Sequence, residues 1–198
     1  MTGIILAGGR SSRLGQDKSF VDIGGQPLMN RVINNLKNVC EEIIIVTKKP
    51  ERFFPLISKF KVKITVDLLP FKAGLIGIYS GMIKSGHKYN FVCGVDMPFI
   101  STEVIKYLAQ QARGFDAAVP VTETGLEPLC AVYSRTCLKV IQEQIQAQRF
   151  KITDFFDKVK INQVEYKNIK KIDPLPEIFF NINTKEDLIQ AEELINRK

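Results

Sequence analysis

Histidine is almost absent from this chain: His87 is the single copy among 198 residues. One histidine excludes zinc sites built on several imidazoles and relays that use more than one of them. A Ser-His-Asp triad would need only one, but the chain has no G-x-S-x-G motif to carry its serine. Because His87 lies in the turn-like stretch Ser85–Lys88, we expect an exposed surface residue.

Cysteines and long apolar runs are also scarce. The spacing of the four cysteines excludes a CxxC metal or redox pair. Three of them, Cys40, Cys93 and Cys130, lie in or beside apolar runs and are expected to be reduced core residues of a cytoplasmic protein. The chain has no run of 18 apolar residues, so we predict no transmembrane helix. The opening Met1–Leu6 has no basic leader and predicts a first strand rather than a signal peptide.

Acidic residues are outnumbered. The chain has 28 Lys and Arg against 21 Asp and Glu, a net charge of +7. Such an excess favours an anionic partner. By itself it does not choose between nucleic acid, a nucleotide, a phosphorylated metabolite and an anionic membrane.

The chain also lacks repeats and low-complexity linkers, and its length predicts one domain over residues 1–198. Short apolar runs alternate with amphipathic stretches, which predicts an α/β fold with a mostly parallel, doubly wound sheet. A mixed segment up to about residue 172 carries no assignment. The expected strands are Thr2–Ala7, Glu42–Thr47, Val62–Val66, Phe91–Val95, Asp116–Val121, Leu129–Tyr133 and Ile178–Ile182, and the expected helices are Pro27–Asn38, Arg52–Phe60, Leu75–Ser85, Thr102–Arg113, Thr136–Gln148 and a last one capped by Thr184.

Ligands of such sheets bind outside the carboxyl ends of the strands. The first strand runs there into the loop Leu6–Lys18, whose glycines let the backbone approach an anion. Arg10, Arg13 and Lys18 within this loop could neutralise a triphosphate. The loop is neither a Walker A motif nor G-x-G-x-x-G, and the alternative is an ordinary flexible connection with solvated charges.

Two carboxylates and two amides are the remaining candidates. Asp96 ends a buried strand and could hold Mg²⁺ together with phosphate oxygens, or could cap its own turn. Asp67 could accept hydrogen bonds from paired N–H donors such as those of guanine, or could be a solvated strand end. Asn181 and Asn183 could contact a polar heterocycle, although Asn183 or Thr184 could simply cap the last helix.

Together these residues resemble the molybdenum cofactor guanylyltransferase family over nearly the whole chain. The opening loop is similar to the family signature Leu-Ala-Gly-Gly-x-Ser-x-Arg-Met-Gly-x-Asp-Lys, with Leu14 in place of methionine. That signature is shared by many sugar nucleotidyltransferases, and the later elements narrow the resemblance. The matching segments are Leu6–Lys18, Gly24–Leu28, Gly94–Phe99, Glu127–Tyr133 and Phe180–Thr184.

The resemblance implies a Rossmann-like nucleotidyltransferase domain, with a nucleotide half over about residues 1–100 and an acceptor half over about 101–198. It implies transfer of GMP from GTP to the terminal phosphate of the molybdenum-molybdopterin cofactor, giving the guanine dinucleotide form and pyrophosphate. The implied cofactor is Mg²⁺, and the implied ligands are GTP and a molybdopterin-type cofactor, with no nucleic acid and no membrane. Other proteins of cofactor biosynthesis, or the enzymes that receive the product, remain open as partners.

The resemblance also assigns roles by position. Arg13, Lys18 and Asp96 would be catalytic, with Mg²⁺ on Asp96, and Asn181 and Asn183 would lie near the pterin-bearing substrate. The nucleotide-binding residues would be Leu6, Ala7, Gly8, Gly9, Lys18, Thr47, Asp67 and Asp96, with Asp67 on the base.

One segment departs from the family pattern. Ala73–Gly77 replaces Gly-Pro-Leu-Ala-Gly, so we expect Ile76 to add bulk beside the base pocket. The alternatives are a related transferase that uses CTP or GTP on another phosphorylated acceptor, and a non-catalytic nucleotide-binding protein of cofactor biosynthesis.

Overall fold

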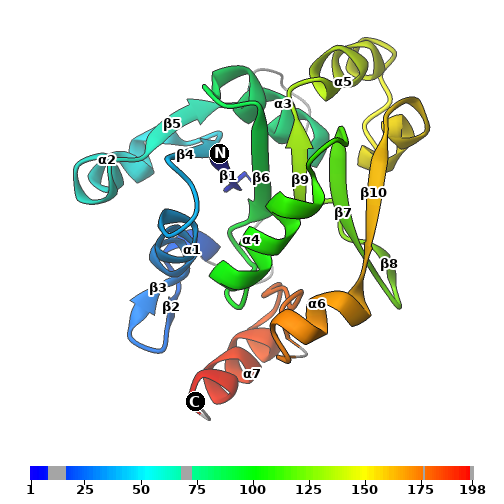
Figure 1. The fold of residues 1–198 in the computed structure, drawn as a ribbon. Helices are drawn as coiled ribbons and strands as arrows, with labels where there is room; N and C mark the ends of the chain where they lie inside the picture. Colours follow the sequence, from blue (N-terminus) through cyan, green and yellow to red (C-terminus); the bar gives the residue numbers. More distant parts are fainter. Residues whose placement is uncertain (9–16, 68–72, 176, 197–198) are drawn as a thin grey trace.

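A computed structural model describes residues 1–8, 17–67, 73–175 and 177–196, and its centre is a sheet in the order β10-β7-β9-β6-β1-β4-β5 (Figure 1). The inner strand β1 pairs in parallel with β4 and β6 over its whole length. Its residues Ile4 and Ile5 have no exposed surface, as expected for an apolar run covered on both faces. The strands are β1 (Thr2–Leu6), β4 (Glu42–Thr47), β5 (Lys63–Val66), β6 (Tyr89–Gly94), β7 (Ala117–Thr122), β9 (Cys130–Ser134) and β10 (Ile161–Glu165).

Strand directions confirm the predicted mostly parallel sheet. β9 runs antiparallel to both β6 and β7, and the short β8 (Gly125–Leu126) pairs antiparallel with β7. The other pairs of the large sheet are parallel. The carboxyl ends of β1, β4, β5 and β6 therefore meet at one edge.

Helices cover both faces of the sheet, which makes it doubly wound as predicted (Figure 1). Ile5 packs into one hydrophobic layer and its neighbour Ile4 into the other, because successive side chains of a strand point to opposite faces. The first layer holds α1 (Leu28–Lys37), α2 (Phe54–Phe60) behind the 3-10 helix η2 (Pro50–Phe53), α4 (Thr102–Gln111) and α6 (Tyr166–Ile172), and the second holds α3 (Gly74–Lys84), α5 (Cys137–Gln146) and the 3-10 helix η3 (Ile152–Lys158).

A third apolar cluster ties the C-terminal end to the hairpin of β2 (Asp22–Ile23) and β3 (Gln26–Pro27). Ile182 and Phe99 meet residues of α7 (Lys185–Asn196) in this cluster. The cluster therefore holds the segment before α7 against the turn that follows β6.

In the C-terminal third, one prediction is wrong and the segment that carried no assignment is structured. The unassigned segment forms η3, β10 and α6, and β10 is an edge strand on β7. Only Val164 of β10 is buried, so the strand has little apolar alternation to reveal it. Ile178–Ile182 forms no strand: Ile178 packs as a non-strand residue into the first hydrophobic layer, and Ile182 packs into the third cluster.

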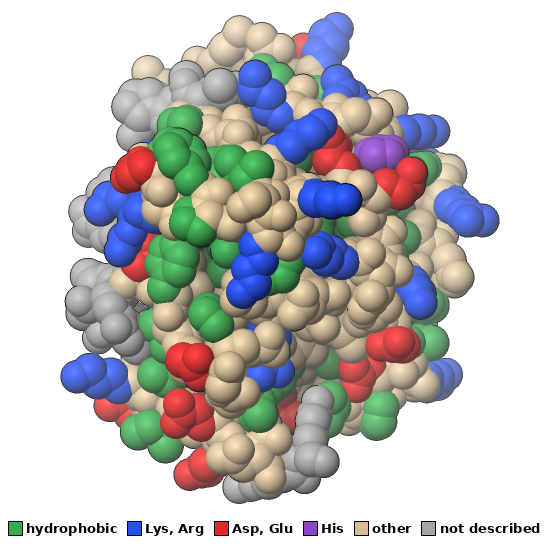
Figure 2. Space-filling model, turned by 90° about the vertical axis from the view of Figure 1, so that its left-hand side faces the viewer, with side chains coloured by type: hydrophobic (Ala, Val, Ile, Leu, Met, Phe, Trp, Pro, Cys, Tyr) green, Lys and Arg blue, Asp and Glu red, His purple; other side chains and the backbone are tan. Residues whose placement is uncertain are grey.

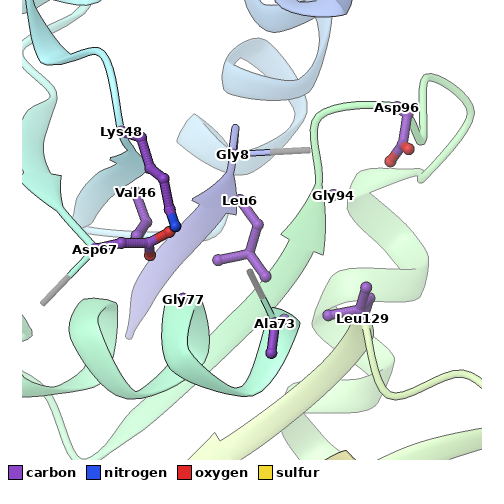
Figure 3. A pocket seen from close by; sticks show the side chains of 11 residues that line it. Leu6, Gly8, Val46, Lys48, Asp67, Ala73, Gly77, Gly94, Asp96 and Leu129 are labelled. Atoms are coloured by element: carbon purple, nitrogen blue, oxygen red, sulfur yellow. The ribbon is translucent and has the colours of Figure 1, made fainter. Parts of the chain in front are cut away.

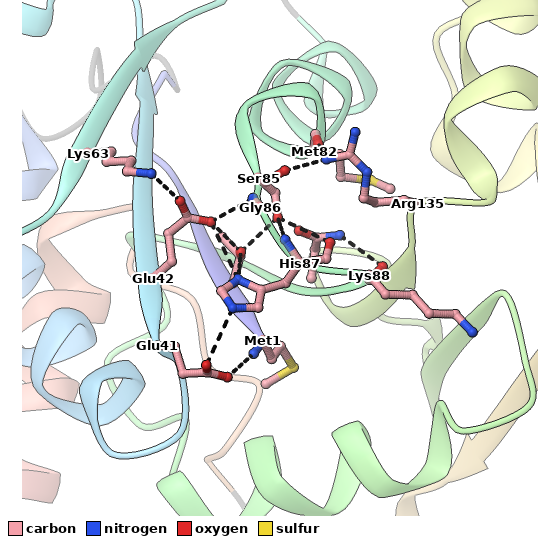
Figure 4. Close-up of polar contacts among 12 residues, drawn as sticks. Met1, Glu41, Glu42, Lys63, Met82, Ser85, Gly86, His87, Lys88 and Arg135 are labelled. Atoms are coloured by element: carbon pink, nitrogen blue, oxygen red, sulfur yellow. Dashed lines mark hydrogen bonds and ion pairs between the residues drawn. The ribbon is translucent and has the colours of Figure 1, made fainter.

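His87 is half-buried rather than exposed, and it belongs to a polar cluster at the amino ends of β1 and β4 (Figure 4). Its Nδ1 lies 2.9 Å from Thr2 Oγ1. Glu42 is the centre of this cluster: burial alone would raise its pKa, but hydrogen bonds from Lys63, Thr2 and the Gly86 amide outweigh burial and lower it to about 2. The cluster lies at the opposite end of the strands from the edge described above.

The expectation about the cysteines holds. All four cysteines are free and buried, and burial raises the pKa of Cys40 to about 12, so its thiol stays protonated. Among the helices of the described ranges, none has both the length and the apolarity that crossing a membrane requires.

The β5 edge is apolar at its centre and basic around it (Figure 2). Phe54, Ile57 and Val66 are exposed there. Between residues 48 and 67 the chain has six Lys and Arg against two Asp and Glu. Six of the 28 Lys and Arg of the chain therefore lie in the segment that ends at Asp67.

Candidate functional site

A cavity of about 550 Å³ lies at the carboxyl ends of β1, β4, β5 and β6 (Figure 3). Its walls come from the strand ends and from the first turn of α3. In a doubly wound sheet this is the expected place for a ligand. The lining residues are Leu6, Gly8, Val46, Lys48, Asp67, Ala73, Gly74, Gly77, Gly94, Asp96 and Leu129.

Glycines keep this cavity open. A methyl group on Gly77 would lie 3.0 Å from Leu6 Cδ2 and 3.6 Å from Asp67 Oδ1. On Gly94 it would run into the Asp96 carboxylate. Any larger residue at Gly94 would therefore move the Asp96 oxygens.

Asp67 forms one end of the cavity, and protein groups satisfy only part of the hydrogen-bonding capacity of its carboxylate. Its Oδ1 is buried and has no hydrogen-bond partner among the described residues. Burial raises the pKa of Asp67, and the positive charge of Lys48 opposes that shift. Figure 3 shows the Lys48 amine beside the Asp67 carboxylate. Because a buried, unsatisfied acceptor is costly, this end of the cavity is suited to a ligand that presents N–H donors.

Asp96 forms the other end, where it meets Lys18. Lys18 Nζ lies 3.4 Å from Asp96 Oδ2 and 2.6 Å from Asn183 Oδ1. Asp17, which precedes Lys18, accepts a hydrogen bond from Ser19 N and pairs with Arg52 at 2.7 Å. A second cavity of about 50 Å³ adjoins this pair, lined by Leu6, Ala7, Asp17, Lys18, Ser19, Val95 and Asp96.

Most of the predicted site residues in the described ranges come together here. Leu6, Gly8, Asp67 and Asp96 line the large cavity, and Ala7 and Lys18 line the small one. Gly9 and Arg13 lie outside the described residues.

Thr47 is a correction. It is buried and lines neither cavity, and its hydroxyl accepts a hydrogen bond from Lys49 N. Side chains alternate along a strand, so Val46 and Lys48 face the cavity while Thr47 faces the other way. The same alternation, counted from the apolar run of β4, was the signal that could have identified Lys48.

Three further residues that were expected beside the ligands do not line either cavity. Asn181 Nδ2 donates to Phe179 O, and the residue lines neither cavity. Asn183 contacts Lys18 instead of a cavity wall. The expectation about Ile76 is wrong, because its side chain is fully buried in the hydrophobic layer under α3 and adds no bulk to the cavity.

Comparisons with known proteins agree with this geometry. Residues 3–160 match the model of the MobA-like NTP transferase domain. A molybdenum cofactor guanylyltransferase of Desulfosudis oleivorans is 37% identical over 197 residues, which cover 98% of this chain and 96% of that protein. A probable one of Pelotomaculum thermopropionicum is 36% identical over 96% of this chain and 91% of its own. This chain belongs to the molybdenum cofactor guanylyltransferase family.

A solved structure supports the same family at the level of the fold. The molybdopterin-guanine dinucleotide biosynthesis protein A of Archaeoglobus fulgidus superposes over 100% of both chains with a TM-score of 0.86, at 26% identity. The cavity of the present chain therefore lies in a nucleotidyltransferase domain.

Nucleotidyltransferases of the molybdenum cofactor guanylyltransferase family generally depend on a divalent metal. The described residues contain no group of three or more His, Cys, Asp or Glu side chains arranged for a metal. Asp96 borders both cavities and offers one partly exposed carboxylate. One carboxylate completed by substrate phosphates is a common arrangement for Mg²⁺, so Asp96 fits that role.

Proposed function

We propose that this protein transfers GMP from GTP to the terminal phosphate of the molybdenum-molybdopterin cofactor, giving the guanine dinucleotide form and pyrophosphate. The observation that carries the proposal is the pairing of two ends in one cavity. Asp67, with its unsatisfied buried oxygen, lies at one end, and Asp96 with Lys18 lies at the other. A base fits the first end and phosphates fit the second.

The base end matches guanine by its donors and acceptors. Guanine presents N1–H and N2–H donors side by side, next to the O6 acceptor. Asp67 accepts from the two donors, and the Lys48 ammonium donates to O6. Adenine presents an unprotonated nitrogen at N1 and a donor at position 6, which reverses the pattern facing both side chains.

The phosphate end is built from cations and one carboxylate. Lys18, Arg13 and the backbone of the loop at Gly9 bind the phosphates and orient the α-phosphorus. Asp96 would hold Mg²⁺, which would neutralise charge on the phosphate oxygens. In-line attack requires the pyrophosphate end of the triphosphate to point away from the acceptor, and Lys18 and Arg13 would bind that end.

In the transfer step, an oxygen of the acceptor's terminal phosphate forms a bond to the α-phosphorus. The bond from that phosphorus to the oxygen that bridges to the β-phosphate breaks, and pyrophosphate leaves with the electron pair. A phosphate monoester has a second pKa of about 6, so it is already largely dianionic at neutral pH. The reaction therefore needs no protein base.

The acceptor side is assigned by position. We assign the acceptor half to about residues 101–198 of the single domain, with Asn181 near the pterin-bearing substrate. The four free, buried cysteines support a reducing compartment, which we take to be the cytoplasm. Protein partners would be other proteins of cofactor biosynthesis or the enzymes that receive the product.

Pyrophosphate release tests this proposal. Purified protein with Mg²⁺ is given GTP, ATP, CTP or UTP, each with and without molybdenum-molybdopterin. We expect release only when GTP and the acceptor are both present. Release with CTP instead of GTP would favour the related transferase, and no release with any nucleotide would favour a non-catalytic binding protein.

A further inference from the structure

Lys18 is held from two sides by residues far away in the sequence. Its Nζ donates to Asn183 Oδ1 at 2.6 Å and lies 3.4 Å from Asp96 Oδ2. The side chain is only 12% exposed. The protein therefore orders this ammonium through its contacts with Asn183 and Asp96.

Asn183 is itself fixed by the start of α7. The backbone amides of Asn183 and Thr184 both donate to Asp187 Oδ2, at 2.7 and 2.8 Å. Asp187 N donates back to Thr184 Oγ1 at 3.1 Å, which completes a reciprocal capping arrangement.

The preceding residue anchors the same segment to the site. Ile182 N donates to the backbone oxygen of Asp96 at 2.9 Å, and the Ile182 side chain is fully buried. The segment Ile182–Asn183 is thus tied both to the turn after β6, through Ile182 N and Asp96, and to α7, through Asn183 N and Asp187.

Ordering a lysine side chain is unfavourable because its flexible stem has many rotamers. When the protein has ordered the ammonium in advance, an incoming phosphate does not have to supply that cost, and affinity rises. The Asn183 oxygen is suited to this because it accepts a hydrogen bond without adding a negative charge beside the phosphates.

We propose that Asn183 is a positioning residue that orients the Lys18 ammonium for the phosphates of the nucleotide, and that the capping arrangement of α7 holds Asn183 in place. This rests on the proposed function, since it takes Lys18 as a phosphate ligand. It changes the role expected for Asn183, which acts through Lys18 and not on the pterin-bearing acceptor.

Binding of GTP without acceptor is the first test, measured by calorimetry in the presence of Mg²⁺. Asn183→Leu keeps the size of the side chain and removes the acceptor oxygen. We expect GTP to bind about 10-fold more weakly, the usual effect of losing one hydrogen bond to a charged group. In the Lys18→Met background the same substitution should have no further effect, because the partner is gone. The KM for the acceptor at saturating GTP should stay unchanged.

Two more variants separate positioning from general damage. Asn183→Gln keeps an uncharged acceptor oxygen on a longer stem and should recover part of the affinity lost in Asn183→Leu. Asp187→Ala removes the bonds to the Asn183 and Thr184 amides and should weaken GTP in the same direction. Glu186→Ala is the matched control, because this exposed neighbour is outside the capping arrangement.

The outcomes are distinct. A raised KM for the acceptor with unchanged GTP binding in Asn183→Leu, or equal losses with and without Lys18, would overturn the positioning role and restore Asn183 as an acceptor contact. Wild-type protein that binds GTP but forms no product would overturn the proposed function, while the variant comparison would still decide the role of Asn183. Wild-type protein that binds no GTP would overturn both.

Discussion

Replacing Asp67 with asparagine tests the base-binding end of the cavity at nearly constant size. The change turns one carboxylate oxygen into an NH2 group and removes the charge. In our account guanine then loses a charged acceptor and one of its donors faces another donor. Hydrogen bonds to charged groups contribute about 1.5–3 kcal/mol, so GTP should bind roughly 10- to 100-fold more weakly. ATP does not present these donors and should change little.

The same variant should gain a new preference. Xanthine carries a carbonyl where guanine carries the 2-amino group, so it presents an acceptor to residue 67. The amide of Asp67→Asn can donate to that carbonyl, whereas the wild-type carboxylate repels it. We therefore expect Asp67→Asn to bind XTP more tightly than GTP, the reverse of the wild-type order.

Calorimetric titration of GTP, ATP and XTP into both proteins measures these ratios. Asp157→Asn, an exposed carboxylate at η3, is the matched control for loss of one charge and should keep the wild-type order. Equal, small losses for GTP and ATP in Asp67→Asn would refute the reasoning and leave Asp67 as a solvated strand end.

The pH dependence of GTP binding gives a second, independent readout of Asp67. Base binding needs the ionised carboxylate, and burial raises its pKa. Affinity should therefore fall as the pH drops through that raised pKa, and this acid limb should vanish in Asp67→Asn. Lys48 lowers the pKa of Asp67, so Lys48→Met should move the limb to higher pH. An unmoved limb in Lys48→Met would contradict the pairing of the two side chains.

Three further predictions concern other parts of the molecule. Gly94→Ala should lower turnover by about 10- to 100-fold while the protein stays folded, because the new methyl group displaces the Asp96 carboxylate. Near-normal turnover would show that the position of this carboxylate does not matter. Single-turnover GMP transfer should be nearly flat from about pH 7 to 9, and His87→Ala should not change it, since a strand of five residues puts His87 roughly 16 Å from the cavity edge. A limb near neutrality that disappears in His87→Ala would mean that a protein base is in use. Glu42→Gln should lower the free energy of unfolding at pH 7 by ~2 kcal/mol, because the pKa of Glu42 is depressed to about 2 in the folded protein. This stabilisation is present above the ordinary pKa of a glutamate, about 4.3, and is lost as the pH falls from there to about 2. Urea unfolding between pH 2 and 7 tests this, and a pH dependence that is the same in both proteins would contradict it.

The sequence predicted the parts of the fold that rest on local patterns. The apolar runs of β1, β4 and β6 predicted strands buried on both faces, and the carboxyl ends of the predicted parallel strands, β5 included, brought Asp67 and Asp96 to one edge. The prediction for Thr47 is wrong by one position, since its neighbours Val46 and Lys48 face the cavity. The end of an apolar run does not show which side chain faces the ligand.

Contacts between distant segments could not be predicted in this way. β10 pairs only with β7 in the described structure and buries one side chain, so neither alternation nor composition revealed it. The contact of Lys18 with Asn183 joins residues 165 positions apart. The local pattern predicted that Thr184 caps the last helix, and the structure confirms this. The packing of Ile182 is what brings that cap to the phosphate end of the cavity, and no local pattern predicts this packing.

The fate of labelled phosphorus tests the central claim most directly. Protein, Mg²⁺ and molybdenum-molybdopterin are incubated in separate reactions with α-³²P and γ-³²P GTP, and the products are resolved by chromatography and mass spectrometry. We expect the α label in a GMP adduct of the acceptor and the γ label in pyrophosphate, in equal amounts. Label released as GMP or inorganic phosphate, with the acceptor mass unchanged, would contradict it.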